Sequence, residues 1–228
     1  MTGIIGAMEK EMHRVIEAMT EVECQTVAGI TFHRGLLCGK PVVAAISGIG
    51  KVFAALCTQS MILLYHPDCI VNIGIAGSLS GSLAIGGLAL ADRLVQHDMD
   101  TTPIGDPPGL ISGLNLVHLP CDRERLVRWE RTAEALGVPS EIGTIASGDC
   151  FMSDPARKEW IGRTFGAIAC EMEGAAVGQV CFVNDVPCNV MRVISDRGGE
   201  DSGREYAENA ERTSAFAFTA LCAYLTLD

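Results

Sequence analysis

The residues best suited to chemistry lie where a largely apolar run ends. Residues 190–194 lead into Ser195 and Asp196, which stand just before two glycines. A run of this kind predicts a strand buried on both faces. Asp196 is then expected where the strand leaves the sheet, at the edge where open α/β folds bind ligands. A carboxyl group there could act as an acid or orient a ligand, but it could also cap the next turn, and its position alone leaves both roles open.

Carboxylates stand at two further strand ends. Glu171 and Glu173 lie where a buried strand gives way to a helix, and Glu9 and Glu11 open the helix after the first strand. Acidic residues in a first helical turn often interact only with the helix dipole, which is the alternative interpretation of both pairs. If a doubly wound sheet brings these strand ends to one edge, three carboxylates converge on a cleft. Such a set suits protonation of a leaving group, activation of water and stabilisation of a cationic sugar.

Two glycine-containing turns could be taken for nucleotide-binding loops. Residues 47–51 follow a strand and open a helix, but Ala45 stands where the Walker pattern needs its first glycine and Val52 where it needs Ser or Thr. Residues 72–78 lack the glycine spacing of a dinucleotide site, so NAD is not expected. Their small side chains would let a ligand approach the backbone closely.

The cysteines and histidines give no metal signature. The chain has ten cysteines, most of them inside apolar runs and none in C-x-x-C spacing, so we expect reduced, buried thiols. Residues 97–100 (His-Asp-Met-Asp) form the only metal-like cluster and are more typical of a polar loop. We expect neither a metal nor another cofactor.

Charge and hydropathy exclude two classes of partner. The formal net charge is -11, with no large Lys/Arg cluster, whereas a nucleic-acid-binding surface needs cations to neutralise phosphates. The N-terminus shows no basic region or cleavage site, and no apolar stretch nears the roughly 18 residues that span a bilayer. We expect a cytoplasmic protein that contacts neither nucleic acid nor membrane.

Strand-length apolar runs alternate with helical patterns along the chain. This alternation predicts one α/β domain over residues 1–228, with three layers and a mixed, mainly parallel central sheet flanked by helices. Strands are expected at 3–7, 41–46, 69–74, 87–95, 142–146, 167–171 and 187–194, and helices at 9–20, 51–65, 122–136, 173–184 and 205–227. Between 24 and 46, three short strands with glycine turns predict an antiparallel excursion. The Gly- and Pro-rich loop 98–120 is long enough to be a lid or an interface.

Six motifs occur in an order and spacing that resemble the 5′-methylthioadenosine/S-adenosylhomocysteine nucleosidases, over nearly the whole chain. They are Gly3-Ile4-Ile5-Gly6-Ala7-Met8-Glu9-x-Glu11, Ser47-Gly48-Ile49-Gly50-Lys51, Gly74-Ile75-Ala76-Gly77, Ser147-Gly148-Asp149-x-Phe151, Glu171-Met172-Glu173-x-x-Ala176 and Ile194-Ser195-Asp196. The resemblance implies the nucleoside phosphorylase-like fold, a homodimer, and hydrolysis of the N-glycosidic bond of 5′-thioadenosines without a cofactor, which releases adenine and a 5-thioribose product.

The resemblance also implies roles for individual residues. Asp196 would support protonation of adenine N7 with the help of Ser195, and Glu11 would activate the attacking water. Glu173 would hold the ribose hydroxyls. The remaining expected substrate-site residues are Phe151, stacked on the purine; Met152, whose backbone reads the Watson-Crick edge; Met8, Ile49, Met172 and Tyr206, around the ribose and alkylthio group; Arg192, near Glu11; and Thr101 and Ile104, from the neighbouring subunit. Two positions depart from the family pattern: Ile75, where many relatives carry a small polar residue, and Tyr206, where Phe is common.

Two other functions compete with hydrolysis. A phosphorylase would break the same bond with phosphate, but such relatives commonly carry a Gly-Asp-Pro-x-Arg-like turn after the first strand, where this chain has residues 8–11 (Met-Glu-Lys-Glu). Gly105-Asp106-Pro107 lies in a later loop and lacks the arginine. A non-catalytic nucleoside-binding protein would not need Glu11, Glu173 and Asp196 together. The residues do not rank methylthioadenosine, adenosylhomocysteine, 5′-deoxyadenosine and aminodeoxyfutalosine as substrates.

Overall fold

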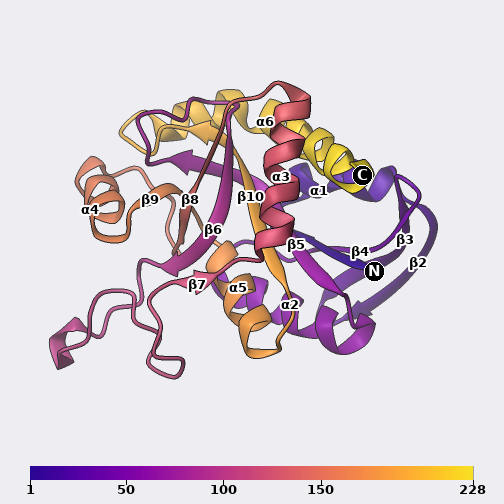
Figure 1. Cartoon of the computed structure of the whole chain (residues 1–228), viewed down its shortest axis with the longest axis horizontal. Coiled ribbons are helices and arrows are strands. Elements are labelled where there is room, and N and C mark those ends of the chain that lie inside the picture. The colour runs from indigo at the N-terminus through magenta and orange to yellow at the C-terminus, as the bar shows by residue number, and fades with distance from the viewer. Residues whose placement is uncertain (228) are drawn as a thin grey trace.

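The computed structural model describes residues 1–227, which form an α/β protein built on one mixed sheet (Figure 1). Within these residues there are ten strands and six α-helices. The strands are β1 (Thr2–Gly6), β2 (Thr20–Val27), β3 (Ile30–Leu37), β4 (Lys40–Ile46), β5 (Cys69–Ser78), β6 (Leu88–Gln96), β7 (Leu119–Pro120), β8 (Ser140–Ser147), β9 (Ala167–Glu171) and β10 (Cys188–Asp196). The helices are α1 (Glu9–Glu17), α2 (Lys51–Tyr65), α3 (Arg123–Leu136), α4 (Pro155–Phe165), α5 (Gly174–Val183) and α6 (Ser202–Thr226).

The sheet contains two sets of strands that run in opposite directions. β1, β4, β5 and β10 are parallel to one another, as are β6, β8 and β9. The sets meet in the antiparallel pairs β5–β9 and β6–β10, and the pairing of β10 with both β5 and β6 closes part of the sheet into a barrel-like ring. The expected mixed sheet is confirmed. The expected antiparallel excursion is confirmed as well, since β2–β3 and β3–β4 are antiparallel. With β6–β7 also antiparallel, the sheet is not clearly mainly parallel, in contrast to the expectation.

The short pairing of β5 with β9 decides where the strand ends lie. These strands touch only through their last residues, with Gly77 opposite Cys170 and Ser78 opposite Ala169. Since they are antiparallel and overlap only at their C-terminal ends, the loops that follow both strands leave from the same place. Asp196, at the end of β10, is also paired with Gly77. The carboxylates at the ends of β9 and β10, which run in opposite directions, are thereby brought together.

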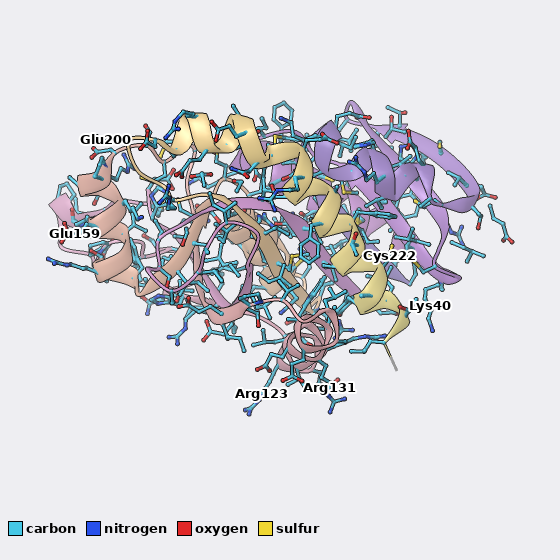
Figure 2. The ribbon with its side chains drawn as sticks, turned by 90° about the horizontal axis from the view of Figure 1, so that it is seen from above. Lys40, Arg123, Arg131, Glu159, Glu200 and Cys222 are labelled. Carbon is cyan, nitrogen blue, oxygen red and sulfur yellow. The ribbon has the colours of Figure 1, made fainter. Side chains whose placement is uncertain are left out.

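Helices cover both faces of the sheet. α1, α3 and α6 pack on one face and α2 and α5 on the other (Figure 1). On the first face Trp129 of α3 is fully buried and stacks on Tyr224 of α6 at 4.2 Å between ring centroids. α6 crosses the molecule from near Glu200 to Cys222, while Arg123 and Arg131 of α3 point outwards (Figure 2). The N-terminal part of α6 is held near the strand ends by Ser202, whose Oγ donates a hydrogen bond to Met152 O in the loop after β8.

Most predicted helices and strands are present, with shifted ends. The first helix ends at Glu17 instead of residue 20, because β2 begins at Thr20, and the last helix begins at Ser202. Helix α4 was not predicted, although its signals are in the sequence: Asp154 accepts hydrogen bonds from Ala156 N and Arg157 N, and a glycine with positive φ ends the helix.

The loop 98–120 is only partly irregular. It contains a short 3₁₀ helix, η1 (Thr102–Ile104), and ends in β7. Ile111 is buried in the core and bridges to Leu116, so the inner part of the loop packs on the core of its own chain. The part that carries η1 extends away from the sheet (Figure 1), and Ile104 is 80% exposed. None of the described helices has the length and apolarity needed to cross a membrane.

Candidate active site

A pocket lies where the strand ends converge. Its walls come from the segments after β1, β4, β8 and β9, from the C-terminal parts of β5, β9 and β10, and from the first turns of α1 and α6. The lining residues are Ala7, Met8, Glu11, Ile49, Ile75, Ala76, Gly77, Cys150, Phe151, Met152, Cys170, Glu171, Met172, Glu173, Ser195, Asp196 and Tyr206. The pocket is therefore mainly apolar, with a few carboxyl groups at fixed positions, as small-molecule sites usually are.

Glu11 is held by the backbone at the start of α1. Its Oε2 accepts hydrogen bonds from Ala7 N at 3.0 Å and Met8 N at 2.9 Å, and its Oε1 accepts one from Ile75 N at 3.0 Å. Gly74 makes room for this carboxylate, since a Cβ atom there would lie 2.5 Å from Glu11 Oε1. Burial raises the pKa of Glu11, against the opposing effects of Arg192 and the three N–H donors.

Asp196 ends β10 and is held at both oxygens. Ser195 Oγ donates a hydrogen bond to Oδ2 at 2.8 Å, and Gly198 N donates one to Oδ1 at 2.9 Å. Gly77 permits the close approach of β5, because a Cβ atom there would lie 2.8 Å from Asp196 Oδ1. Burial raises the pKa of Asp196 above its ordinary value despite these two donors. The group is thus suited to holding a proton.

Glu173 stands at the start of α5. It accepts a hydrogen bond from Gly50 N at 2.7 Å, which joins the loop after β4 to the loop after β9. Burial, together with the nearby Glu171 carboxylate, raises the pKa of Glu173 to about 7. A polar group of a ligand beside Glu173 would therefore determine whether this carboxyl is protonated or ionised.

Glu171 and Arg192 form a buried ion pair at the back of the pocket. Glu171 also accepts hydrogen bonds from Ser147 Oγ and from Gly174 N. Arg192 NH2 donates to Asn72 Oδ1 at 2.5 Å. Both charges are thereby compensated, which a buried pair requires. Glu171 lines the pocket but was given no role from the sequence. Arg192, which was expected near Glu11, does not line the pocket itself, but its charge acts to lower the pKa of Glu11.

Two aromatic rings and a methionine form the other wall. Phe151 and Tyr206 meet edge to face at 5.6 Å between centroids, and Tyr206 Oη donates to Met8 Sδ at 3.4 Å. Ser202 Oγ donates to Met152 O at 3.0 Å, which ties the loop after β8 to α6. Phe151 and Ile49 are 49% and 54% exposed. Their exposed apolar surface lies at the pocket opening, where a planar ligand could cover it.

Among the described residues, no group of three or more His, Cys, Asp or Glu side chains could hold a metal ion. In the cluster at 97–100, Asp98 is paired with Lys51 at 2.7 Å.

Comparison with known proteins identifies the family. The model named "Phosphorylase superfamily" matches residues 2–226. A protein of Shewanella pealeana named 5′-methylthioadenosine/S-adenosylhomocysteine nucleosidase is 39% identical over 224 residues, which cover 96% of this chain and 97% of that protein. The chain belongs to the 5′-methylthioadenosine/S-adenosylhomocysteine nucleosidase family.

Solved structures are similar throughout the chain. A Helicobacter pylori nucleosidase variant with 5′-methylthioadenosine in its active site is 34% identical, with a TM-score of 0.94 and coverage of 98% of this chain and 97% of that chain. A second Helicobacter pylori structure, named futalosine hydrolase, is also 34% identical with a TM-score of 0.94, and covers 98% of this chain and 96% of that chain.

The residues expected from resemblance to the nucleosidases can now be placed. The structure gathers eleven of them around the pocket: Met8, Glu11, Ile49, Ile75, Phe151, Met152, Met172, Glu173, Ser195, Asp196 and Tyr206. Thr101 and Ile104 lie in the loop 98–120 and do not line the pocket of their own chain. They were expected only at the pocket of a neighbouring subunit. The lining residues that were given no role are Ala7, Ala76, Gly77, Cys150, Cys170 and Glu171. Glycine spacing signalled Gly77, but nothing in the sequence distinguished the two cysteines from core residues.

Proposed function

We propose that this protein hydrolyses the N-glycosidic bond of 5′-methylthioadenosine and S-adenosylhomocysteine, releasing adenine and a 5-thioribose product. The observation that carries the proposal is the convergence of Glu11, Glu173 and Asp196 on one pocket. Each carboxyl has its own set of hydrogen-bond donors. The relatives described above carry the same activity in their names.

In this proposal Asp196 acts at the leaving group. Its raised pKa lets it hold a proton, which it delivers to N7 of adenine. The protonated base then takes up the electrons of the breaking N9–C1′ bond and leaves as neutral adenine. Glu11 accepts the proton of the water that attacks C1′, and its three N–H partners fix its direction. Glu173 accepts hydrogen bonds from the ribose hydroxyls. Bond breaking and water attack need no group beyond these carboxyls.

The base and alkylthio subsites follow from the apolar wall. Phe151 stacks on the purine, and the Met152 backbone meets its Watson-Crick edge. Met8, Ile49, Ile75, Met172 and Tyr206 surround the ribose and the 5′ substituent. Ile75 can offer only its backbone N–H to Glu11 and an apolar side chain to the ligand.

The charges around the pocket favour water over phosphate as the nucleophile. As far as residues 1–227 show, no Lys or Arg lines it, and Arg192 behind it is paired with Glu171. A phosphate dianion would face Glu11 and Glu173 without a compensating cation. Hydrolysis therefore fits the site better than phosphorolysis.

Adenine release tests this proposal. The wild-type protein is incubated with 5′-methylthioadenosine in the presence and absence of phosphate, and adenine and the sugar product are quantified. We expect equal rates and a free 5-methylthioribose product, and Glu11→Gln should suppress release because an amide cannot accept the proton of water. Phosphate-dependent formation of a ribose 1-phosphate would establish a phosphorylase, and absence of release would contradict an enzymatic role. The same assay with S-adenosylhomocysteine, 5′-deoxyadenosine and aminodeoxyfutalosine ranks the substrates.

We further propose that residues 1–228 act as one catalytic domain of a cytoplasmic homodimer. Large apolar side chains are exposed on α2 and at the end of α5, two helices that are in contact with each other, and exposed apolar surface of this extent is typical of interfaces. These side chains are Val52, Phe53, Leu56, Leu63, Phe182 and Val183. In the dimer, Thr101 and Ile104 of one subunit would close the alkylthio subsite of the other.

A further inference from the structure

Three residues outside the pocket form a closed ring of hydrogen bonds between three loops. Lys51 N donates to Asp149 Oδ1 at 2.8 Å, and Asp149 N donates to Asp98 Oδ2 at 2.9 Å. Lys51 Nζ donates to Asp98 Oδ1 at 2.7 Å and closes the ring. Lys51 begins α2 after β4, Asp98 follows β6, and Asp149 follows β8. We call these three residues the Lys51 ring.

The backbone is shaped to let these loops meet. Gly50 has a φ of +98°, which disfavours any residue with a side chain, and a Cβ atom there would lie 3.0 Å from Asp149 Oδ1. A Cβ atom on Gly148 would collide with the His97 ring. Two glycines therefore stand at contacts between these loops, and a side chain at either position would force its neighbours to move.

The ion pair in the ring is sheltered from solvent. The side chains of Lys51 and Asp98 are only 18% and 21% exposed. Burial acts to raise the pKa of Asp98, but the hydrogen bonds from Lys51 and from Asp149 N outweigh it and keep the pKa below its ordinary value. Lys51 Nζ also donates to Gln96 Oε1 at 3.1 Å. Gln96 in turn donates to Gln179 of α5 at 2.5 Å, so the ring is anchored to α5 as well.

The ring joins the two halves of the pocket. On one side, Gly50 precedes Lys51 and donates its N–H to Glu173, the proposed ribose-binding group. On the other side, Asp149 stands two residues before Phe151, the proposed base-stacking ring. We propose that Lys51, Asp98 and Asp149 are positioning residues that hold the ribose-binding loop and the base-binding loop at a fixed spacing. The assignment of these two halves rests on the proposed function.

Hydrogen exchange tests the ring without any substrate. The amides of Gly50, Lys51 and Asp149 all donate within or next to the ring. In Lys51→Met, which keeps an unbranched side chain one atom shorter but loses its charged donor, peptides covering 47–52 and 148–152 should exchange roughly tenfold faster, as expected for loss of a hydrogen bond between charged groups. Arg163→Met is the matched control, because it removes an exposed ion pair with Glu159 on α4 and should leave both peptides unchanged.

Kinetics then separates positioning from mere structure. Glu11 and Asp196, which would act on the breaking bond, lie outside the ring, so Lys51→Met should raise KM for 5′-methylthioadenosine by roughly tenfold while kcat changes by less than about threefold. Asp98→Asn should do the same, and Lys51→Arg, which retains a cationic donor, should restore most of the wild-type KM. A thermal melt of each variant confirms that it is folded. If Lys51→Met does not fold, Asp98→Asn is used in its place for both experiments.

The results of the two experiments either support the positioning role of the Lys51 ring or overturn it. Unchanged exchange in both loops overturns it, because the ring would then not tie them together. Faster exchange with an unchanged KM also overturns it, since the spacing would not matter for binding. If the wild-type protein releases no adenine, the proposed function fails, while the exchange experiment still decides whether the ring joins the two loops.

Discussion

The three carboxyls of the pocket differ mainly in how many donors reach them. Glu11 accepts three backbone hydrogen bonds, Asp196 accepts one from a backbone amide and one from a hydroxyl, and Glu173 accepts one. Each donor stabilises the ionised form, whereas burial favours the protonated form. Burial raises the pKa of all three carboxyls, and Glu11 is the one whose direction is fixed by the largest number of donors.

Asp196→Asn should abolish most turnover while leaving the pocket intact. The amide is nearly isosteric with the carboxyl but cannot deliver a carboxyl proton to the base, so we expect adenine release to fall roughly 10²- to 10⁴-fold, or about 3 to 5 kcal/mol of transition-state stabilisation. A tight-binding nucleoside analogue should still bind in calorimetry. Asp185→Asn, at an exposed position after α5, is the control. Turnover within a few-fold of wild type would remove Asp196 from the mechanism.

The pKa of Glu173 predicts how stability depends on pH. In the unfolded chain this carboxyl ionises near 4.5, whereas in the folded protein it ionises near 7. Between these values the folded state binds more protons, so the free energy of unfolding should fall as pH rises from 5 to 7.5, by roughly 2 kcal/mol from this group. Urea unfolding at pH 5 and at pH 7.5 measures this change in the free energy of unfolding. Glu173→Gln should reduce the dependence of the free energy of unfolding on pH without abolishing it, since the raised pKa values of Glu11 and Asp196 act in the same direction. The same pH dependence in the variant and the wild type would contradict this explanation.

Residue types at strand ends were predictable, but their partners were not. Asp196, Glu173 and Glu11 could be singled out because each follows the end of an apolar strand, and because a doubly wound sheet could bring these strand ends to one edge, although turn caps and helix dipoles also favour acids there. Their donors are mostly backbone amides, which carry no sequence signature. The pairing of Glu171 with Arg192 joins positions 21 residues apart on different strands, and only the fold reveals it.

At the scale of elements, β5 positions the site through its glycines. Gly74 and Gly77 leave space for Glu11 and Asp196 from neighbouring elements, and any side chain there would occupy that space. The sequence indicated a strand with small residues for close approach of a ligand. The structure shows that the approach is made by two carboxyl groups of the protein itself.

Gly74→Ala should therefore impair catalysis by displacing Glu11. The new methyl group would lie 2.5 Å from Glu11 Oε1, and a shift of about 1 Å in a catalytic group can cost roughly 10²-fold in rate. Adenine release should fall by about that factor, with a loss of about 1 to 3 kcal/mol in stability from overpacking. Gly81→Ala is the matched control, because nothing lies within 4 Å of a Cβ atom there. Equal rates in the two variants would show that Glu11 tolerates the displacement.

The relative direction of the strands buried on both faces could not be predicted, and the reason is physical. A strand buried on both faces is apolar along its whole length whether its neighbours are parallel or antiparallel. β9 is buried throughout, and its parallel pairing with β8 and antiparallel pairing with β5 leave no difference in its sequence. Helix α4 was missed for another reason: its cap and its terminal glycine are present, but its apolar positions are few.

At the scale of the whole molecule, the apolar faces and the extended part of loop 98–120 point to assembly. The exposed side chains on α2 and α5 belong to helices that cover one face of the sheet. Ile111 anchors the inner part of the loop to its own core, whereas Ile104 has no comparable cover within the described chain. An apolar group at the tip of a loop anchored in this way gains stability only if another surface covers it.

Ile104→Asp should weaken binding of 5′-alkylthio nucleosides more than binding of adenine. In the proposed dimer Ile104 lies against the alkylthio group in the partner's pocket, and a carboxylate there would be desolvated without a partner, so we expect the Kd for 5′-methylthioadenosine analogues to rise roughly tenfold or more and the Kd for adenine to change little. Ile142→Asp is the control, since Ile142 is an exposed residue of β8 that does not line the pocket. Light scattering at assay concentrations should show a dimer for both variants. A fully active monomer would contradict the assembly, and equal losses for both ligands would place Ile104 away from the alkylthio subsite.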